Sequence, residues 1–186
     1  MSRDDERRDP RVGRSRAALR RALLELLAVT PFESITGAMI ATRAGIGYAT
    51  YFRHYADPRD LLMDTVAHLA DELVEKMLPA LLSSGTHVAA RALVEAVNAE
   101  RSTYQALLQG AGDATRGILV RHLSDHMADL PDLSPEWLPQ RLAVRFAIVG
   151  TIELLDWWLR EEPLLDLDRV ADLVDRLVIA KITAAS

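Results

Sequence analysis

Apolar residues recur three and four positions apart along almost the whole chain, which is the spacing of amphipathic helices. Leu19, Leu23, Leu26 and Leu27 are the first example, with arginines between them. No stretch of the sequence alternates apolar and polar residues as a half-buried strand does, and no segment repeats at a fixed period. The pattern predicts an all-α protein.

Prolines, glycines and short polar runs divide this pattern into about nine predicted helices. Pro31 ends the first, because proline lacks a backbone N–H and disfavours a helical conformation in the residue before it. The pair Asp57-Pro58 opens a long helix, since aspartate is a good cap and proline suits the first helical position. The predicted helices span 14–29, 37–44, 48–55, 58–82, 86–99, 101–109, 113–129, 134–161 and 167–184.

The composition is that of a soluble globular protein, with 49% hydrophobic and 26% charged residues among 186. The chain has no cysteine, which excludes disulfides and thiolate metal sites and favours a reducing compartment. The charged first residues do not resemble a signal peptide, and the most apolar run, 146–152, is too short to cross a bilayer. We therefore expect a cytoplasmic protein without a membrane partner.

Charge is distributed unevenly along the chain. Residues 10–59 contain eight arginines and three carboxylates, whereas residues 61–186 contain 11 basic and 19 acidic side chains. A basic head on an acidic body favours contact between the head and a polyanion, although long helices also scatter charge by chance. Residues 1–13 are expected to form a mobile arm, which is either a solvated tail or a segment that enters a minor groove.

Glycines and aromatic rings gather in the segment 42–62, TRAGIGYATYFRHYADPRDLL, although only 5% of the residues in the chain are aromatic. Gly45 and Gly47 place a tight turn between the short helices 37–44 and 48–55. With the preceding helix, this forms a helix-turn-helix arrangement, in which the second short helix enters the major groove of DNA.

The helix 48–55 has two faces at about 100° per residue. Tyr51 and Tyr55 fall on the side that faces a small core. Tyr48, Phe52 and Arg53 fall on the other side, together with Ala49, where side chains reach base edges and phosphates.

Residues 14–62 resemble the DNA-binding head of the TetR family of bacterial transcriptional repressors. The matching run is ALLELLAVTPFESIT…IATRAGIGYATYFRHYADPRDLL, which covers about a quarter of the chain. The positions that fit the family pattern are Phe32, Ile40-Ala41, Ala44-Gly45-Ile46, Thr50, His54, Tyr55 and Leu61-Leu62. The resemblance implies a DNA-binding domain over 14–57 and a linker helix followed by a helical effector-binding and dimerisation domain over 58–186.

Three positions depart from that pattern. Gly47 replaces the usual capping serine, and Phe52 stands where a tyrosine is usual, so that it offers only apolar contact, as to a thymine methyl. Pro58 replaces a frequent lysine and leaves Arg59 as the nearest phosphate-binding candidate. The residues expected to contact DNA are Thr36, Gly47, Tyr48, Ala49, Thr50, Phe52, Arg53, His54 and Arg59.

The segment 142–159 is apolar around most of its helix, so it needs partners on several sides. With the last helix it is expected to form a four-helix bundle across a two-fold axis, although both helices also suit a monomer core. The expected dimer residues are Phe146, Gly150, Leu154, Trp158, Leu173 and Leu177, and the candidate pocket residues are Tyr104, His126, Phe146 and Trp157.

Catalytic and metal-binding patterns are sparse in the sequence. His122 and His126 lie four positions apart on one predicted helical face, with no third firm ligand, so no metal and no cofactor are expected. No Ser/His/Asp spacing, phosphate-binding loop or pair of carboxylates indicates an enzyme.

The leading hypothesis is a homodimeric repressor that binds operator DNA and is released by a small apolar effector. A regulator that acts without a ligand, or as an activator, is also compatible with the sequence. From another class, so is a helical carrier or enzyme for an apolar molecule, with the head as a structural cap.

Overall fold

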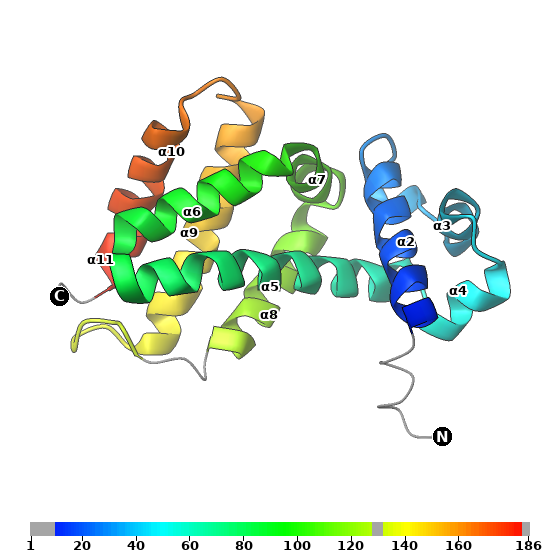
Figure 1. Cartoon of the computed structure of the whole chain (residues 1–186), viewed down its shortest axis with the longest axis horizontal. Helices are drawn as coiled ribbons and strands as arrows, with labels where there is room; N and C mark the ends of the chain where they lie inside the picture. The colour runs from blue at the N-terminus through cyan, green and yellow to red at the C-terminus, as the bar shows by residue number, and fades with distance from the viewer. Residues whose placement is uncertain (1–9, 128–131, 184–186) are drawn as a thin grey trace. The chain divides into compact units, whose positions relative to one another are not determined.

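The computed structural model describes residues 10–127 and 132–183 as helices joined by short connections (Figure 1). No strand occurs within these ranges, and the predicted all-α class is confirmed. None of the helices in the described ranges is both long enough and apolar enough to span a membrane.

The chain divides into two compact units, with the division between Thr65 and Val66. The sequence predicts a boundary earlier, between 57 and 58, at the start of the long helix α5 (Pro58–Ser84). The first part of α5 belongs instead to the first unit, in which Leu61 and Leu62 are fully buried.

The first unit consists of α2 (Pro10–Leu27), a short 3-10 turn η1 (Phe32–Ser34), α3 (Gly37–Ala44), α4 (Tyr48–His54) and the start of α5. Helix α2 begins at Pro10, so the end of the predicted arm 1–13 is helical, and residues 1–9 lie outside the described part of the chain. The buried side chains of this unit include Leu19, Leu23, Ile40, Tyr51, Tyr55 and Leu61.

Local capping residues determine where α3 and α5 begin and where α3 ends. The Thr36 hydroxyl accepts a hydrogen bond from the Met39 N–H at 3.3 Å, as a helix N-cap does. Gly45 ends α3 with a φ of 66°, a left-handed conformation that glycine adopts without steric cost. At α5, Asp57 accepts from the Asp60 N–H at 2.8 Å, and Asp60 accepts in return from the Ala56 N–H at 3.0 Å.

The second unit contains the rest of α5 with α6 (Thr86–Ala99), α7 (Arg101–Gln105), α8 (Gly112–Met127), α9 (Gln140–Arg160), α10 (Leu167–Val174) and α11 (Ala180–Ile182). Within this unit α6 packs along α10, and α8 packs along α9 (Figure 1). Helix α9 begins six residues later than the predicted start at 134, because Pro135 and Pro139 disfavour a helical conformation in the residues before them.

Two predicted helices are interrupted by π-helical turns. One is η2 (Ala106–Gly110), which follows α7, and the other is η3 (Asp175–Ile179), between α10 and α11. Each turn widens the helix locally and redirects the side chains that follow it. Such turns are frequent at functional sites.

Candidate nucleic-acid interface and ligand cavity

Helix α4 has one buried and one exposed face, as the spacing of its residues predicts. Tyr51 and Tyr55, the residue that caps the helix end, are buried in the first unit. On the other face the side chains of Tyr48 and Phe52 are 56% and 48% exposed, and Arg53 is exposed beside them. An aromatic and basic surface is therefore open to a partner.

The buried face of α4 depends on a glycine in α3. A Cβ atom added at Gly37 would lie 2.8 Å from Cε1 of Tyr51, so only glycine leaves room for this ring. Gly37 is a poor residue for the first turn of a helix, and the packing of Tyr51 explains its presence. The Tyr51 hydroxyl is buried without a hydrogen-bond partner in the described structure, and burial raises its pKa to about 12.

The exposed face of α4 is partly preorganised by contacts between its own side chains. The rings of Tyr48 and Phe52 meet edge to face, with centroids 4.7 Å apart. Arg53 Nη2 donates to the Thr50 hydroxyl at 2.8 Å, which orients the guanidinium along the helix. The rings and the guanidinium are thereby held on one surface.

The other predicted DNA contacts lie around this helix. Gly47 is the N-cap of α4 and makes no side-chain cap, so the turn is left without the usual hydroxyl. Ala49, Thr36 and Arg59 are exposed, whereas His54 is half-buried. Thr36 uses its hydroxyl to cap α3, as described above.

Several arginines of the head are paired with carboxylates. Arg43 donates to Glu25 at 2.5 Å, which joins α3 to α2. Arg16 and Arg20 both pair with Asp64 of α5. The positive charge that the sequence places on the head is therefore in part neutralised inside it.

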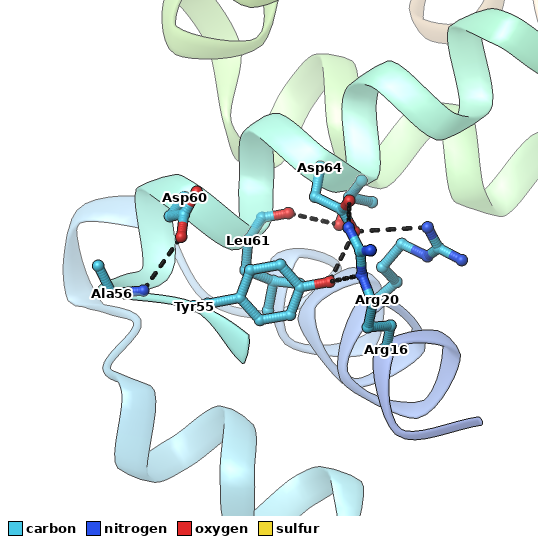
Figure 2. A network of polar contacts seen from close by, with 8 residues as sticks. Arg16, Arg20, Tyr55, Ala56, Asp60, Leu61 and Asp64 are labelled. Carbon is cyan, nitrogen blue, oxygen red and sulfur yellow. Dashed lines mark hydrogen bonds and ion pairs between the residues drawn. The ribbon is translucent and has the colours of Figure 1, made fainter. Parts of the chain in front are cut away.

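Asp64 is the centre of a network that joins α2, the end of α4 and α5 (Figure 2). Its carboxylate accepts from the Tyr55 hydroxyl at 2.6 Å, from Arg16, and from Arg20 at 3.4 Å. Arg16 Nε also donates to the Tyr55 oxygen at 3.2 Å. Burial and the bond to Asp64 raise the pKa of Tyr55 above its ordinary value, so the hydroxyl stays protonated. This network fixes the end of α4 on α2 and α5.

The second unit contains a partly open cavity of about 160 Å³. Its walls come from α5 to α9, both π-turns, α11 and Thr183, and they consist almost entirely of Leu, Ile, Val, Met and Ala side chains. A second cavity of about 70 Å³ shares Leu81, Ile182 and Thr183 with the first.

One of the four predicted pocket residues lines the larger cavity. Tyr104 lies on its wall, buried, whereas Phe146 and Trp157 are not among the residues that line it. Phe146 is 59% exposed, because it lies on the outer side of α9. The side chain of His126 lies outside the described residues.

The predicted dimer residues fall into two groups. Phe146 and Leu177 are exposed, and Leu154 and Leu173 are half-buried. Trp158 is 0% exposed, so its side chain lies in the core of the protomer and not on its surface. Gly150 is also used within the protomer, because a Cβ there would lie 3.1 Å from Cγ2 of Val178.

His122 forms a hydrogen bond with Asp71, in which its Nε2 atom lies 2.7 Å from Oδ1 of the carboxylate. In the described part of the molecule, no group of three or more His, Cys, Asp or Glu side chains is arranged to hold a metal ion.

Comparison with solved structures identifies the fold. A TetR-family regulator from Syntrophomonas wolfei aligns with a TM-score of 0.67 at 12% identity, over 88% of this chain and 92% of the other. NalD, a repressor from Pseudomonas aeruginosa, aligns with a TM-score of 0.61 at 17% identity, over 91% of this chain and 95% of NalD. FadR from Bacillus subtilis, solved with stearoyl-CoA, aligns with a TM-score of 0.60 at 19% identity, over 89% of this chain and 98% of FadR. The chain has the TetR-regulator fold. No family model and no curated protein matches the sequence.

Within this TetR-type fold, sequence reasoning missed two features. In the Asp64 network, Arg16 and Arg20 are separated from Asp64 by 48 and 44 positions in the sequence. The only local signal is that the two arginines lie four positions apart on α2. The threonines of the cavity wall, Thr115, Thr151 and Thr183, carry no spacing that distinguishes them from core residues.

Proposed function

We propose that the protein is a homodimeric, sequence-specific DNA-binding repressor that a small apolar molecule releases from its operator. The observation that carries this proposal is the face of α4, which exposes Tyr48, Phe52 and Arg53 while its other face is buried. A short helix that presents aromatic and basic side chains after a glycine turn is suited to the major groove. The TetR-regulator fold supports the same reading.

In the proposed complex each side chain of α4 has a chemically distinct contact. Arg53, and Arg59 at the start of α5, bind phosphates or guanine edges. Thr50 and His54 form hydrogen bonds with phosphate oxygens. Phe52 has no polar atom, so its contact in the groove is with a thymine methyl. The proposed operator therefore carries a thymine opposite Phe52.

The proposed effector site is the cavity of the second unit. Its apolar wall suits a hydrophobic molecule, and FadR of the comparison holds stearoyl-CoA. An effector lowers DNA affinity if it binds more tightly to conformations that fit the operator poorly.

The proposed dimer uses the exposed apolar side of α9 together with η3. Leu142, Phe146 and Val149 are exposed along α9, and Leu177 is exposed on η3, which packs against α9 through Val178. A two-fold dimer places two α4 helices on a palindromic operator with half-sites about 34–36 Å apart, or a multiple of that distance.

The experiment that tests DNA binding compares two arginines of the same head. Purified protein is titrated onto the DNA upstream of its own gene and onto a scrambled fragment, and binding is measured by fluorescence anisotropy. Arg53→Gln is expected to weaken specific binding by about 1 to 3 kcal/mol, or about 5- to 150-fold. Arg43→Gln, which removes the same charge from a residue bound to Glu25, is expected to change it by less than about twofold.

Equal effects of the two variants, or equal affinity for the specific and scrambled fragments, would contradict the proposal. If the operator is not upstream of the gene, selection of bound fragments from genomic DNA supplies it, and the same two variants are compared on the selected site.

A further inference from the structure

The wall of the larger cavity has few polar groups. Four of its residues carry a hydroxyl, and the other described residues that line it are aliphatic or methionine, without a charged side chain. The hydroxyls belong to Tyr104, Thr115, Thr151 and Thr183. The chemistry of a ligand is therefore determined by which of these four groups is free to bond it.

Two of the four hydroxyls are used by the π-turns. Thr115 donates its hydroxyl to the Leu107 carbonyl in η2 at 3.1 Å, and Thr183 donates to the Ile179 carbonyl in η3 at 3.0 Å. A hydroxyl has one hydrogen, so neither threonine has an O–H left to donate to a ligand. The π-turns therefore leave the wall with two candidate donors.

Those donors are Tyr104 and Thr151, whose hydroxyls have no hydrogen-bond partner among the described residues. Burial, and then the carboxylates of Glu100 and Glu72, raise the pKa of Tyr104 above its ordinary value. The phenol therefore keeps its proton at physiological pH and can donate it to an acceptor in the cavity.

The charges around the cavity disfavour an anion. Glu100 and Glu72 act on Tyr104, and Asp132 lines the adjoining smaller cavity. None of the described residues that line either cavity is lysine, arginine or histidine. A carboxylate or phosphate buried there would lose its hydration without gaining a cationic partner, which is costly. An ammonium in the larger cavity would likewise find no carboxylate on its wall.

The size of the cavity sets the size of the ligand. Its volume of about 160 Å³ is close to that of an engineered apolar cavity of about 150 Å³ that binds benzene. One ring with a short substituent fills such a space, whereas a long acyl chain exceeds this volume and would extend beyond it.

We propose that this cavity binds an uncharged molecule the size of one substituted ring, whose single polar atom accepts a hydrogen bond from Tyr104. The role of that molecule as an effector rests on the proposed function, whereas its binding does not.

The test is a series of ligands of similar size, each with one aromatic ring, whose polar groups are neutral, negative or positive. Benzyl alcohol, benzoate and benzylammonium are titrated by calorimetry into the full chain at neutral pH, without DNA. Benzyl alcohol is expected to bind at least tenfold more tightly than either ion, because only the ions lose charge hydration. No measurable binding of benzyl alcohol, or tighter binding of either ion, overturns the proposal.

Variants show whether the ligand occupies this cavity and bonds Tyr104. Tyr104→Phe is expected to weaken the binding of benzyl alcohol about 3- to 10-fold. The binding of toluene, which has no polar atom, should be unchanged. Ser102→Ala, which removes the hydroxyl of an exposed α7 residue that is not part of the cavity wall, should change neither by more than about twofold. Ala147→Leu, which fills the cavity, should abolish both.

The variant outcomes are decisive in either direction. If Tyr104→Phe has no effect on benzyl alcohol, or Ala147→Leu leaves binding intact, the assignment of Tyr104 or of the cavity is wrong. Because these titrations contain no DNA, they separate the two claims. Ligand binding without operator binding contradicts the proposed function alone, and operator release by benzoate but not benzyl alcohol contradicts this inference alone.

Discussion

Neighbouring residues of α4 have opposite environments, and this is clearest at Tyr51 and Phe52. The ring of Tyr51 is buried against Gly37, whereas Phe52 is half exposed on the face proposed to meet DNA. The tyrosines at 51 and 55 are both buried but differ in one respect. The hydroxyl of Tyr55 has two charged hydrogen-bond partners, Asp64 and Arg16, and that of Tyr51 has no partner in the described structure.

Removal of these two hydroxyls is therefore expected to have opposite results. Tyr55→Phe should lower the free energy of unfolding by about 1 to 3 kcal/mol, because Asp64 and Arg16 lose a buried partner. Tyr51→Phe should leave it unchanged or raise it by about 1 kcal/mol, since it removes an unsatisfied buried group. Urea unfolding followed by circular dichroism measures both, and equal losses in the two variants would contradict the assignment.

The raised pKa of Tyr51 predicts a loss of stability at alkaline pH. In the unfolded chain a tyrosine ionises from about pH 10, whereas Tyr51 in the folded protein keeps its proton to about pH 12. The folded state therefore binds the proton more tightly, and this contribution is complete below pH 10 and is lost as the pH rises towards 12. The unfolding free energy measured from pH 8 to 11 should fall less steeply in Tyr51→Phe than in the wild type. Identical slopes would show that Tyr51 does not titrate differently in the two states.

At the scale of whole helices, the capping residues explain which boundaries the sequence predicts. Helix α3 spans the predicted residues 37–44, because the Thr36 cap and the left-handed Gly45 act locally. The π-turns at 106–110 and 175–179 have no local signal, since packing around the cavity decides where a helix widens. The exposed face of α9 could not be predicted from the sequence either, because the helix is apolar on most sides. Only the packing shows that Trp158 is buried and Phe146 is exposed.

The ion pairs between α2 and α5 share one carboxylate, that of Asp64. Asp64→Asn is expected to lower the free energy of unfolding by about 1 to 3 kcal/mol, because Arg16, Arg20 and Tyr55 lose a charged partner in a partly buried site. Glu25→Gln, the same chemical change in the exposed pair with Arg43, should cost less than about 1 kcal/mol. Thermal and urea unfolding of both variants measure the difference, and an equal cost would remove the special role of Asp64.

For the whole molecule, the exposed apolar stripe of α9 predicts a defined oligomeric state. Phe146→Asp is expected to convert the proposed dimer to a monomer, because it places a charge among Leu142, Val149 and Leu177. Leu164→Asp is the control, since Leu164 is 97% exposed in the connection before α10. Light scattering coupled to size-exclusion chromatography gives the mass. A monomeric wild type, or a Phe146→Asp variant that stays dimeric, would contradict the proposed interface.

The pairing of arginines with carboxylates inside the head also determines how strongly operator affinity depends on ionic strength. Arg16, Arg20, Arg21 and Arg43 are held by carboxylates, whereas Arg14, Arg53 and Arg59 are exposed and can bind phosphates. The two heads of the proposed dimer double this set, and each phosphate contact releases about 0.9 of a condensed counterion. Operator affinity should then fall with a logarithmic slope of about −5, or about a thousandfold between 50 and 200 mM salt. A change in ionic strength would therefore shift operator occupancy without any effector.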